Sequence, residues 1–288
     1  MRWTDSTNTF RCSPRADAAR TIGGVTPHRI DRLWPDPASD LSLDAAFEAF
    51  ALPPAPEGRP LVAINMVTTV DGRAQVGGKA DALSSRPDRR LMRLLRAAFD
   101  AVGSGVGTLR ADDFYSRVPD DLAAQRVAAG RPAQPTALLI AGRAPVPTDR
   151  RWFTYAEQPR VVVVGRDSPH APKDGEEAEV PLPVETWVAP TELPEAAWLL
   201  ERLAAFGVRS LLLEGGPTTN ASFLAADALD EAFWTIDASL VGSDALPMIA
   251  PIPHGSPWAD APRQGRLVSV HRSGDELFLR YRFESAGP

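Results

Sequence analysis

The segment SLLLEGGPTTNASFLAA, residues 210–226, predicts a buried strand, a tight turn and a helix in direct succession. Residues 211–213 are leucines, and such a short apolar run is typical of a buried strand. Two glycines interrupt this run, and Pro217 suits the first turn of a helix, where its missing N–H has no carbonyl to bond. We therefore expect a helix that begins at Pro217, with Gly216 as its N-cap.

The same turn has the chemistry of a phosphate site. The N–H groups in the first turn of a helix are free, and Thr218 and Thr219 add hydroxyl donors. Glu214 stands at the carboxyl end of the strand, where open α/β sheets bind their ligands. A plainer interpretation stays open, in which the glycines serve only the geometry of the turn, because short glycine motifs also arise by chance.

Composition limits the classes of function. The chain has 288 residues, a net charge of −6 and no basic block, so the charge pattern of a nucleic-acid-binding protein is missing. One cysteine, Cys12, and four scattered histidines predict neither a disulfide nor a metal site. No apolar run is long enough to cross a bilayer, and the N-terminal segment lacks the apolar core of a signal peptide. We therefore expect a cytoplasmic protein with a small-molecule substrate and no membrane partner.

Residue types divide the chain into three parts. Residues 1–27 are polar without periodicity, which predicts a disordered arm. Residues 28–59 predict a lead-in segment with one helix near 43–50 and a proline-rich linker. Residues 60–285 carry the alternating apolar runs and helical patterns of the main domain.

Within the main domain we expect both buried strands and amphipathic helices. Strands are predicted at 60–70, 100–104, 136–141, 160–165 and 230–241, with an edge strand at 185–189. Helices are predicted at 86–98, where Ser84 and Ser85 precede Asp88 at the spacing of a capping box, and at 194–206. Surface loops are predicted at 115–135, with room for a helical turn at 121–129, and at the acidic segment 169–183. The glycines and Thr108 after the strand 100–104 favour N–H groups turned toward a ligand.

The last predicted element is an antiparallel hairpin with one solvent-exposed face. Its strands are 266–271 and 276–283, and the second one has apolar residues at every other position from Leu277 to Phe283. Together with the earlier runs, this predicts an α/β fold with a mixed, mostly parallel sheet, flanked by helices and completed by a C-terminal hairpin.

Three segments together resemble one family. They are VAINMVTTVDGRA at 62–74, LMRLLRAAFDAVGSGVGTLRADD at 91–113 and LLLEGGPTTNASFLAADALDEAFWTIDASLVG at 211–242. In order and spacing they resemble the reductase domain of riboflavin biosynthesis, whose fold is like that of dihydrofolate reductase. The likeness extends over residues 60–283, and the combination is far more specific than any single motif.

The resemblance implies an NADPH-dependent pyrimidine reductase. Such enzymes reduce a ribosylamino-pyrimidine 5′-phosphate to its ribitylamino form, by hydride transfer to C1′ of the ring-opened imine. The activity implied is that of a 5-amino-6-(5-phosphoribosylamino)uracil reductase, and a homodimer is implied as well. Because hydride transfer depends on holding two carbons close together, we expect catalysis mainly from positioning and exclusion of water.

The site residues follow from the same resemblance and from residue chemistry. Expected catalytic residues are Asn65, Asp71, Asp112 and Glu214. Expected substrate contacts are Arg96, Arg117 and Glu214. Expected NADPH contacts are Val67, Thr69, Ser84, Gly105, Gly107, Thr108, Asp112, Gly165, Arg166, Gly215, Gly216, Pro217, Thr218, Thr219 and Asn220. Plainer roles stay open for three of them, since Asp71 and Asp112 are also suited to holding their own turns and Arg166 to pairing with Asp167.

The chain departs from the family pattern after Asp112. The family continues Asp-Asp-Pro into a phosphate-binding segment that ends in arginine, whereas residues 113–117 here read DFYSR. Either Arg117 replaces the missing contact, or Phe114 and Tyr115 shape the pocket for another substrate. Three hypotheses therefore stand: the riboflavin-pathway reductase, an NADPH reductase of another heterocycle such as dihydrofolate, and a non-catalytic nucleotide-binding module. The zinc-deaminase signatures His-x-Glu and Pro-Cys-x-x-Cys do not occur in this sequence.

Overall fold

A computed structural model describes residues 28–48, 50–79, 81–171, 184–242, 245–252, 256, 258 and 262–284. The predicted N-terminal arm and the acidic cluster of segment 169–183 lie outside the described residues. No helix among the described residues is both long and apolar enough to cross a membrane.

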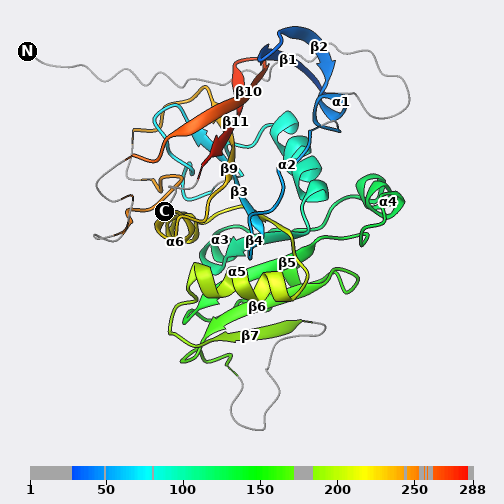
Figure 1. Cartoon of the computed structure of the whole chain (residues 1–288). Helices are drawn as coiled ribbons and strands as arrows, with labels where there is room; N and C mark the ends of the chain where they lie inside the picture. Colours follow the sequence, from blue (N-terminus) through cyan, green and yellow to red (C-terminus); the bar gives the residue numbers. More distant parts are fainter. Residues whose placement is uncertain are drawn as a thin grey trace, which may run out of the picture.

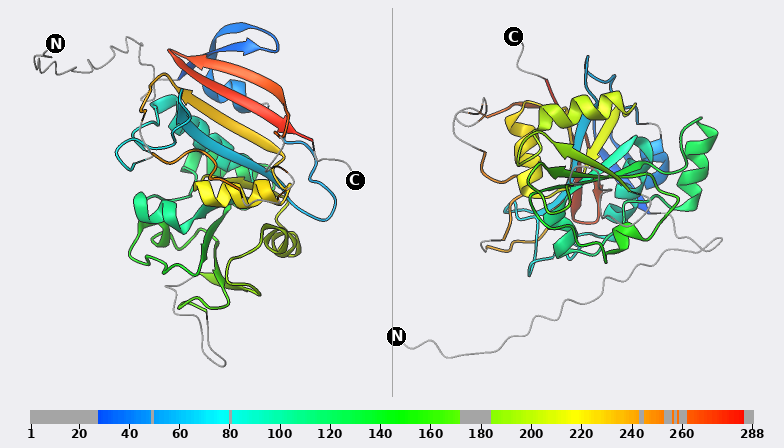
Figure 2. Two further views of the ribbon diagram at one scale, coloured as in Figure 1. Left: turned by 90° about the vertical axis from the view of Figure 1, so that its left-hand side faces the viewer. Right: turned by 90° about the horizontal axis from the view of Figure 1, so that it is seen from below.

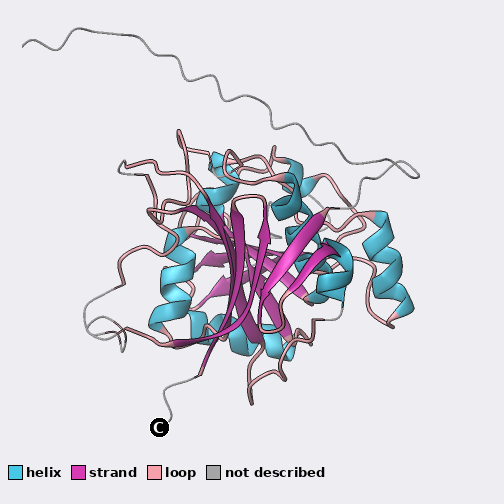
Figure 3. Ribbon diagram, turned by 90° about the horizontal axis from the view of Figure 1, so that it is seen from above, coloured by secondary structure: helices cyan, strands magenta, loops and turns pink. Residues whose placement is uncertain are grey.

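The described chain forms one eleven-stranded sheet with helices on both sides (Figures 1 and 3). Its strand order is β2-β1-β10-β11-β9-β3-β8-β4-β5-β6-β7. The strands are β1 (Arg29–Trp34), β2 (Ala38–Ser42), β3 (Leu61–Thr69), β4 (Ala101–Gly105), β5 (Thr136–Gly142), β6 (Arg160–Gly165), β7 (Glu185–Ala189), β8 (Ser210–Leu213), β9 (Glu231–Asp237), β10 (Gly265–Ser273) and β11 (Glu276–Phe283). The helices are α1 (Leu43–Glu48), α2 (Arg86–Ala98), α3 (Val106–Ala111), α4 (Asp120–Ala128), the 3-10 turn η1 (Arg151–Phe153), α5 (Ala196–Ala205) and α6 (Pro217–Ala225).

The sheet is mixed and mostly parallel, as predicted. Every pairing from β9 across to β7 is parallel, and the antiparallel strands lie on the other side of β9. All residues of β4, β6 and β8 are buried, because helices cover both faces of the parallel part. This explains why these strands are continuous apolar runs in the sequence.

Alternate residues of β3 pack into two different hydrophobic clusters. Figure 2 shows the sheet and its helices from two further sides. Val62 and Ile64 pack with α5 and α6 on one face. Leu61 and Ala63 point to the other face, where they pack with α1, α2 and α4. The period of two along a strand thus places one helical layer on each side of the sheet.

Several elements differ from the prediction. Strands β1 and β2 were not expected, because only Ile30 among the residues of β1 is buried and the apolar signal is correspondingly weak. The glycine-containing segment after β4 forms helix α3, which was not predicted, and the helical turn within 115–135 is the full helix α4. In β11 the buried face carries Glu276, Phe278 and Arg280, whereas the alternating apolar residues are half-buried. Arg280 is accepted there because its guanidinium pairs with the fully buried Glu231 at 2.7 Å.

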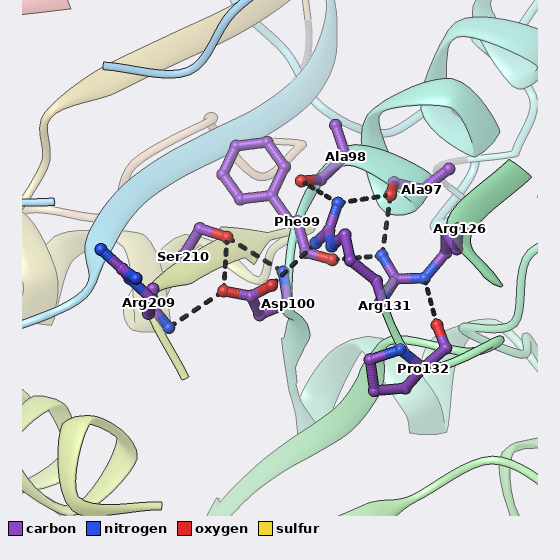
Figure 4. Close-up of polar contacts among 9 residues, drawn as sticks. All are labelled: Ala97, Ala98, Phe99, Asp100, Arg126, Arg131, Pro132, Arg209 and Ser210. Carbon is purple, nitrogen blue, oxygen red and sulfur yellow. Dashed lines mark hydrogen bonds and ion pairs between the residues drawn. The ribbon is translucent and has the colours of Figure 1, made fainter. Parts of the chain in front are cut away.

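A polar cluster fastens the end of α2 to the amino ends of β4 and β8 (Figure 4). Arg126 donates to the carbonyls of Ala97 and Phe99, both at 2.7 Å, and to that of Pro132 at 2.8 Å. Arg131 bridges from the carbonyl of Ala98 to the carboxylate of Asp100. The two cations satisfy carbonyls that a helix end leaves without partners, at the C-terminus where positive charge is favoured.

Replacement of Arg126 by methionine should lower the free energy of unfolding by about 2–4 kcal/mol, because buried carbonyls lose their donor. Urea unfolding followed by circular dichroism measures this change. Arg143→Met is the control, since the Arg143–Glu192 pair is largely exposed and should contribute less than about 1 kcal/mol. Equal stabilities of the two variants would contradict the structural role of Arg126.

Candidate active site

Two adjoining cavities lie where the parallel strands end, as expected for an open α/β sheet. The charged cavity has a volume of about 570 Å³. It is lined by Asn65, Met66, Val67, Ala74, Lys79, Asp81, Ser84, Asp88, Arg89, Met92, Arg93, Arg96, Ser104, Thr108, Ala111, Asp112, Asp113, Phe114, Tyr115, Arg151 and Glu214. The glycine cavity has a volume of about 590 Å³. It is lined by Met66, Ala74, Gln75, Gly78, Gly105, Val106, Gly107, Thr108, Ala111, Asp112, Ile140, Ala141, Gly142, Leu193, Pro194, Glu214, Gly215, Gly216, Pro217, Thr218, Thr219, Ser222 and Leu246.

The turn after β8 forms one wall of the glycine cavity. Gly215 has a φ of 96°, a conformation that residues with a side chain rarely adopt. Its carbonyl accepts a hydrogen bond of 2.9 Å from the N–H of Gly105, which fixes the turn to the end of β4. Helix α6 then begins at Pro217 with Gly216 as its N-cap, as predicted. The first residues of this helix, whose N–H groups have no partner within the helix, therefore line the glycine cavity.

The wall shared by the two cavities contains a buried ion pair. Arg96 on α2 donates through Nε and Nη2 to the two carboxylate oxygens of Glu214, both at 2.7 Å. The side chains are 5% and 8% exposed, so water competes little for either charge. Arg96 also donates to the carbonyl of Tyr115 at 2.9 Å, which ties the loop after α3 to the pair. This geometry fixes both charged groups at the cavity wall.

Further cations surround the charged cavity. Arg89 pairs with Asp81 at 3.5 Å. The guanidinium of Arg151 lies 4.8 Å from the ring centre of Tyr115. The backbone N–H of Arg151 donates to the carboxylate of Asp113 at 2.7 Å. Among the described residues, neither Arg93 nor Arg151 has an ion-pair partner. Their charges are therefore available to an anionic ligand.

Asp88 is a buried carboxyl on the wall of the charged cavity and is 6% exposed. Burial raises its pKa above the ordinary value of 3.8, and hydrogen bonds with the side chains of Thr235 and Ser84 oppose that rise only in part. The nearby carboxylate of Glu214 acts in the same direction as burial. Asp88 therefore keeps its proton to a higher pH than an exposed aspartic acid does.

A family model described as the RibD C-terminal domain matches residues 60–276. The chain belongs to this family. A curated RibD-family relative, the 2,5-diamino-6-ribosylamino-4(3H)-pyrimidinone 5′-phosphate reductase of Methanothermobacter thermautotrophicus, is 30% identical over 77% of this chain and 98% of its own length. The enzyme of the same name from Archaeoglobus fulgidus is 32% identical over 78% of the chain and 99% of its own length. Family and relatives identify the chain as an oxidoreductase of the riboflavin-pathway reductase family, as the sequence predicted.

Solved structures agree on the RibD-type fold. A pyrimidine reductase-like protein from Corynebacterium diphtheriae superposes with a TM-score of 0.67 over 78% of this chain and 92% of that one, at 21% identity. Acinetobacter baumannii RibD gives a TM-score of 0.62 over 79% of this chain and 59% of that one, at 20% identity. The identities are low, so these likenesses show the fold alone.

In this RibD-family chain, most residues expected from the sequence lie on the two cavities. Those on the walls are Asn65, Val67, Ser84, Arg96, Gly105, Gly107, Thr108, Asp112, Glu214, Gly215, Gly216, Pro217, Thr218 and Thr219. Val67 and Ser84, expected beside the cofactor, line the charged cavity rather than the glycine cavity. Phe114 and Tyr115 also line the charged cavity, which agrees with their suggested effect on its shape.

Three expected residues at loops and strand ends lie outside both cavities. Arg117 pairs with Asp120 at 2.9 Å and stacks on Tyr155, and its expected phosphate contact stays a prediction. Arg166 pairs with its neighbour Asp167 at 3.4 Å, which is the plainer of the two roles left open. Gly165 is required for chain packing, because a Cβ there would lie 1.9 Å from the carbonyl oxygen of Glu192.

Thr69, Asp71 and Asn220 also lie outside the cavities and have structural partners. Asn220 is fully buried and donates through its side chain to the carbonyl of Met248 at 2.9 Å. The hydroxyl of Thr69 donates to the Asp71 carboxylate at 2.6 Å. That carboxylate also accepts from the N–H of Gly242 at 2.8 Å, so it joins two loops and does not reach the cavities.

The pKa of Asp71 gives a test of this structural role. Hydrogen bonds from Thr69 first, and then from Gly242, lower the pKa from 3.8 to about 2. The ionised carboxylate therefore stabilises the fold fully above pH 4, and this stabilisation is lost as the pH falls toward 2. Asp71→Asn should be less stable than the native chain at neutral pH and equally stable at the acid end, as measured by urea unfolding. An equal difference in unfolding free energy at neutral and at acid pH would refute this structural role of Asp71.

Several cavity residues were not expected from the sequence. Ile140 and Gly142 lie at the carboxyl end of β5. Because open α/β sheets bind ligands at the carboxyl ends of their parallel strands, these residues could have been predicted. Leu193 comes from the loop before α5 and Arg151 from η1, far along the chain from the motifs. Asp88 was recognised only as a helix-capping partner. Asp88 lines the charged cavity, and its carboxyl is hydrogen-bonded to Thr235 on β9, which is 147 residues further along the chain.

Proposed function

We propose that this protein is an NADPH-dependent reductase that converts a ribosylamino-pyrimidine 5′-phosphate to the ribitylamino form. The observation that carries the proposal is the pair of adjoining cavities with one shared wall. The glycine cavity offers a helix N-terminus and apolar residues, and the charged cavity offers cations and carboxylates. A dinucleotide and a phosphorylated polyhydroxyl substrate have these complementary chemistries.

The glycine cavity fits NADPH by its donor set. Gly216, Thr218 and Thr219 stand at the start of α6, where a pyrophosphate is favoured by free N–H groups and by the helix dipole. Ile140, Leu193 and Pro194 form an apolar section further along the cavity, suited to a flat base. When bound, NADPH supplies the hydride.

The charged cavity fits the substrate. Arg93 and Arg151 are suited to the 5′-phosphate, in place of the arginine that ends the usual family loop. Asn65 and the paired Glu214 are placed to hold sugar hydroxyls, and Arg96 keeps the carboxylate fixed. Asp112 lies on both cavities, so its carboxylate is placed beside the boundary between cofactor and substrate. Positioning of this kind is the principal means of catalysis in hydride transfer.

A second candidate is a reductase of another heterocycle, such as dihydrofolate. Phe114 and Tyr115 favour it, since they bring aromatic surface to the charged cavity where the family has a different loop. The same cavity's arginines favour a phosphorylated substrate instead, and for this reason the riboflavin-pathway substrate is our principal proposal.

The deciding experiment follows NADPH oxidation by absorbance. The substrates are the diamino-pyrimidinone phosphate named for the archaeal relatives, 5-amino-6-(5-phosphoribosylamino)uracil, and dihydrofolate. Turnover of either ribosylamino compound supports the proposal and identifies the form used. Turnover of dihydrofolate alone would overturn it, as would tight NADPH binding without any turnover, the behaviour of a nucleotide-binding module. Replacing NADPH by NADH tests the cofactor preference.

The proposal includes a homodimer that works in the cytoplasm. The family resemblance of the sequence supports the dimer. Light scattering on the purified chain measures the mass in solution, and a monomer at enzyme concentrations would remove the dimer from the proposal.

A further inference from the structure

Asp88 is held in one place by contacts from separate elements. It lies in the first turn of α2, where its N–H donates to the hydroxyl of Ser85 at 3.1 Å. Its carboxyl is hydrogen-bonded to the hydroxyls of Ser84, before the helix, and Thr235, on β9. The residue is 6% exposed, and it lines the charged cavity. These contacts fix the position of the carboxyl relative to a ligand in the charged cavity.

The surroundings of Asp88 favour the neutral acid. Burial raises the pKa most, and the carboxylate of Glu214 raises it further. The hydroxyls of Thr235 and Ser84, and the cation of Arg89, act in the opposite direction and are outweighed. The N-terminal position in the helix also favours the anion, a contribution that is small beside full desolvation. The pKa of this carboxyl therefore lies above that of an exposed aspartic acid, beside a cavity lined by other charged groups.

Reduction of an imine requires such a proton. As a hydride bonds to the imine carbon, the π electrons of the C=N bond move to nitrogen, which must take up a proton to become an amine. The nicotinamide hydride donor supplies only the hydride. Glu214 accepts two hydrogen bonds from Arg96 and is thereby committed as an acceptor. Asp88 differs from Glu214 because no cation forms an ion pair with it among the described residues.

We propose that Asp88 is the catalytic acid that delivers this proton to the substrate nitrogen. The inference rests on the proposed function and adds to it the source of the proton. The carboxyl O–H bond breaks, the N–H bond forms, and the carboxylate left behind accepts hydrogen bonds from Ser84 and Thr235. Ser84 lines the same cavity, so it can return a proton from water to Asp88 after each turnover.

The experiment compares Asp88→Asn with the native enzyme over the pH range in which both are folded. The native kcat should fall as the pH rises through the pKa of Asp88, because the neutral acid is the active form. In Asp88→Asn, kcat should be lower by about 100-fold or more, and that alkaline limb should disappear, while KM changes much less. Asp44→Asn is the matched control, since Asp44 binds Arg90 on the outer side of the same helix at 3.0 Å. It should retain the native pH profile.

A second measurement does not depend on activity. The infrared difference spectrum between native protein and Asp88→Asn, without cofactor or substrate, should contain the C=O stretch of a protonated carboxyl, and this band should titrate at the pH of the kinetic limb. A kcat within about threefold of native with an unaltered limb overturns the role of Asp88, and so does a rise in KM alone. If the native enzyme itself does not turn over the ribosylamino substrates, the proposed function fails, which is a distinct result.

Discussion

Replacement of Glu214 by alanine should lower kcat/KM for the ribosylamino-pyrimidine phosphate by about 100-fold or more. The carboxylate lies on the wall shared by both cavities and is held by two hydrogen bonds of 2.7 Å from Arg96. Its removal takes away a contact for the substrate, and it also frees Arg96 to move. Steady-state kinetics with saturating NADPH measures the loss.

The same substitution should destabilise the fold by about 3–5 kcal/mol, since the cation of Arg96 stays buried without its partner. A second variant separates stability from catalysis. In the double variant Glu214→Ala with Arg96→Met, no unpaired charge remains, so stability should return toward the native value while activity stays low. Recovery of activity together with stability would show that Glu214 has only a structural role.

Replacement of Gly216 by valine should raise the dissociation constant for NADPH by about 100-fold or more. A Cβ at this position would lie 3.1 Å from the hydroxyl oxygen of Thr108, and the branched methyl groups must extend from there into the glycine cavity. They would cover the N–H groups at the start of α6, which the pyrophosphate needs. Fluorescence titration with NADPH measures the affinity.

Ala225→Val is the matched control for this substitution. It adds a branched side chain to the last turn of the same helix, away from both cavities. Its affinity for NADPH should stay within about twofold of native, and circular dichroism should show both variants folded. Unchanged NADPH binding in a folded Gly216→Val protein would refute the phosphate site at this turn.

The parallel part of the fold was predictable because strands that are buried on both faces are continuous apolar runs in the sequence. Segments such as 160–165 are apolar at nearly every position, and a helix such as α2 carries both a capping serine and a regular apolar stripe. The prediction of α2 was correct at both ends. Strands β1 and β2 were missed because they lie at the sheet edge, where few side chains are buried and little pattern is imposed.

The residues of the candidate site likewise fall into those that local sequence predicts and those that it does not. Residues next to a strand end, such as Glu214 and Gly216, were found because local sequence decides their position. Arg117 and Arg166 were expected at the site from their charge and their place in the sequence, and each has a carboxylate neighbour within a few residues that pairs with it. Asp88 and Arg151 enter the site through packing between distant segments, and no local pattern marks that.

The two cavities have part of their lining in common. Met66, Thr108 and Glu214 belong to both, so a ligand in the glycine cavity becomes part of the surface that a second ligand meets. If one ligand changes the affinity for the other, thermodynamic reciprocity requires the second ligand to change the affinity for the first by the same factor. Titration of each proposed ligand with and without the other would measure this coupling.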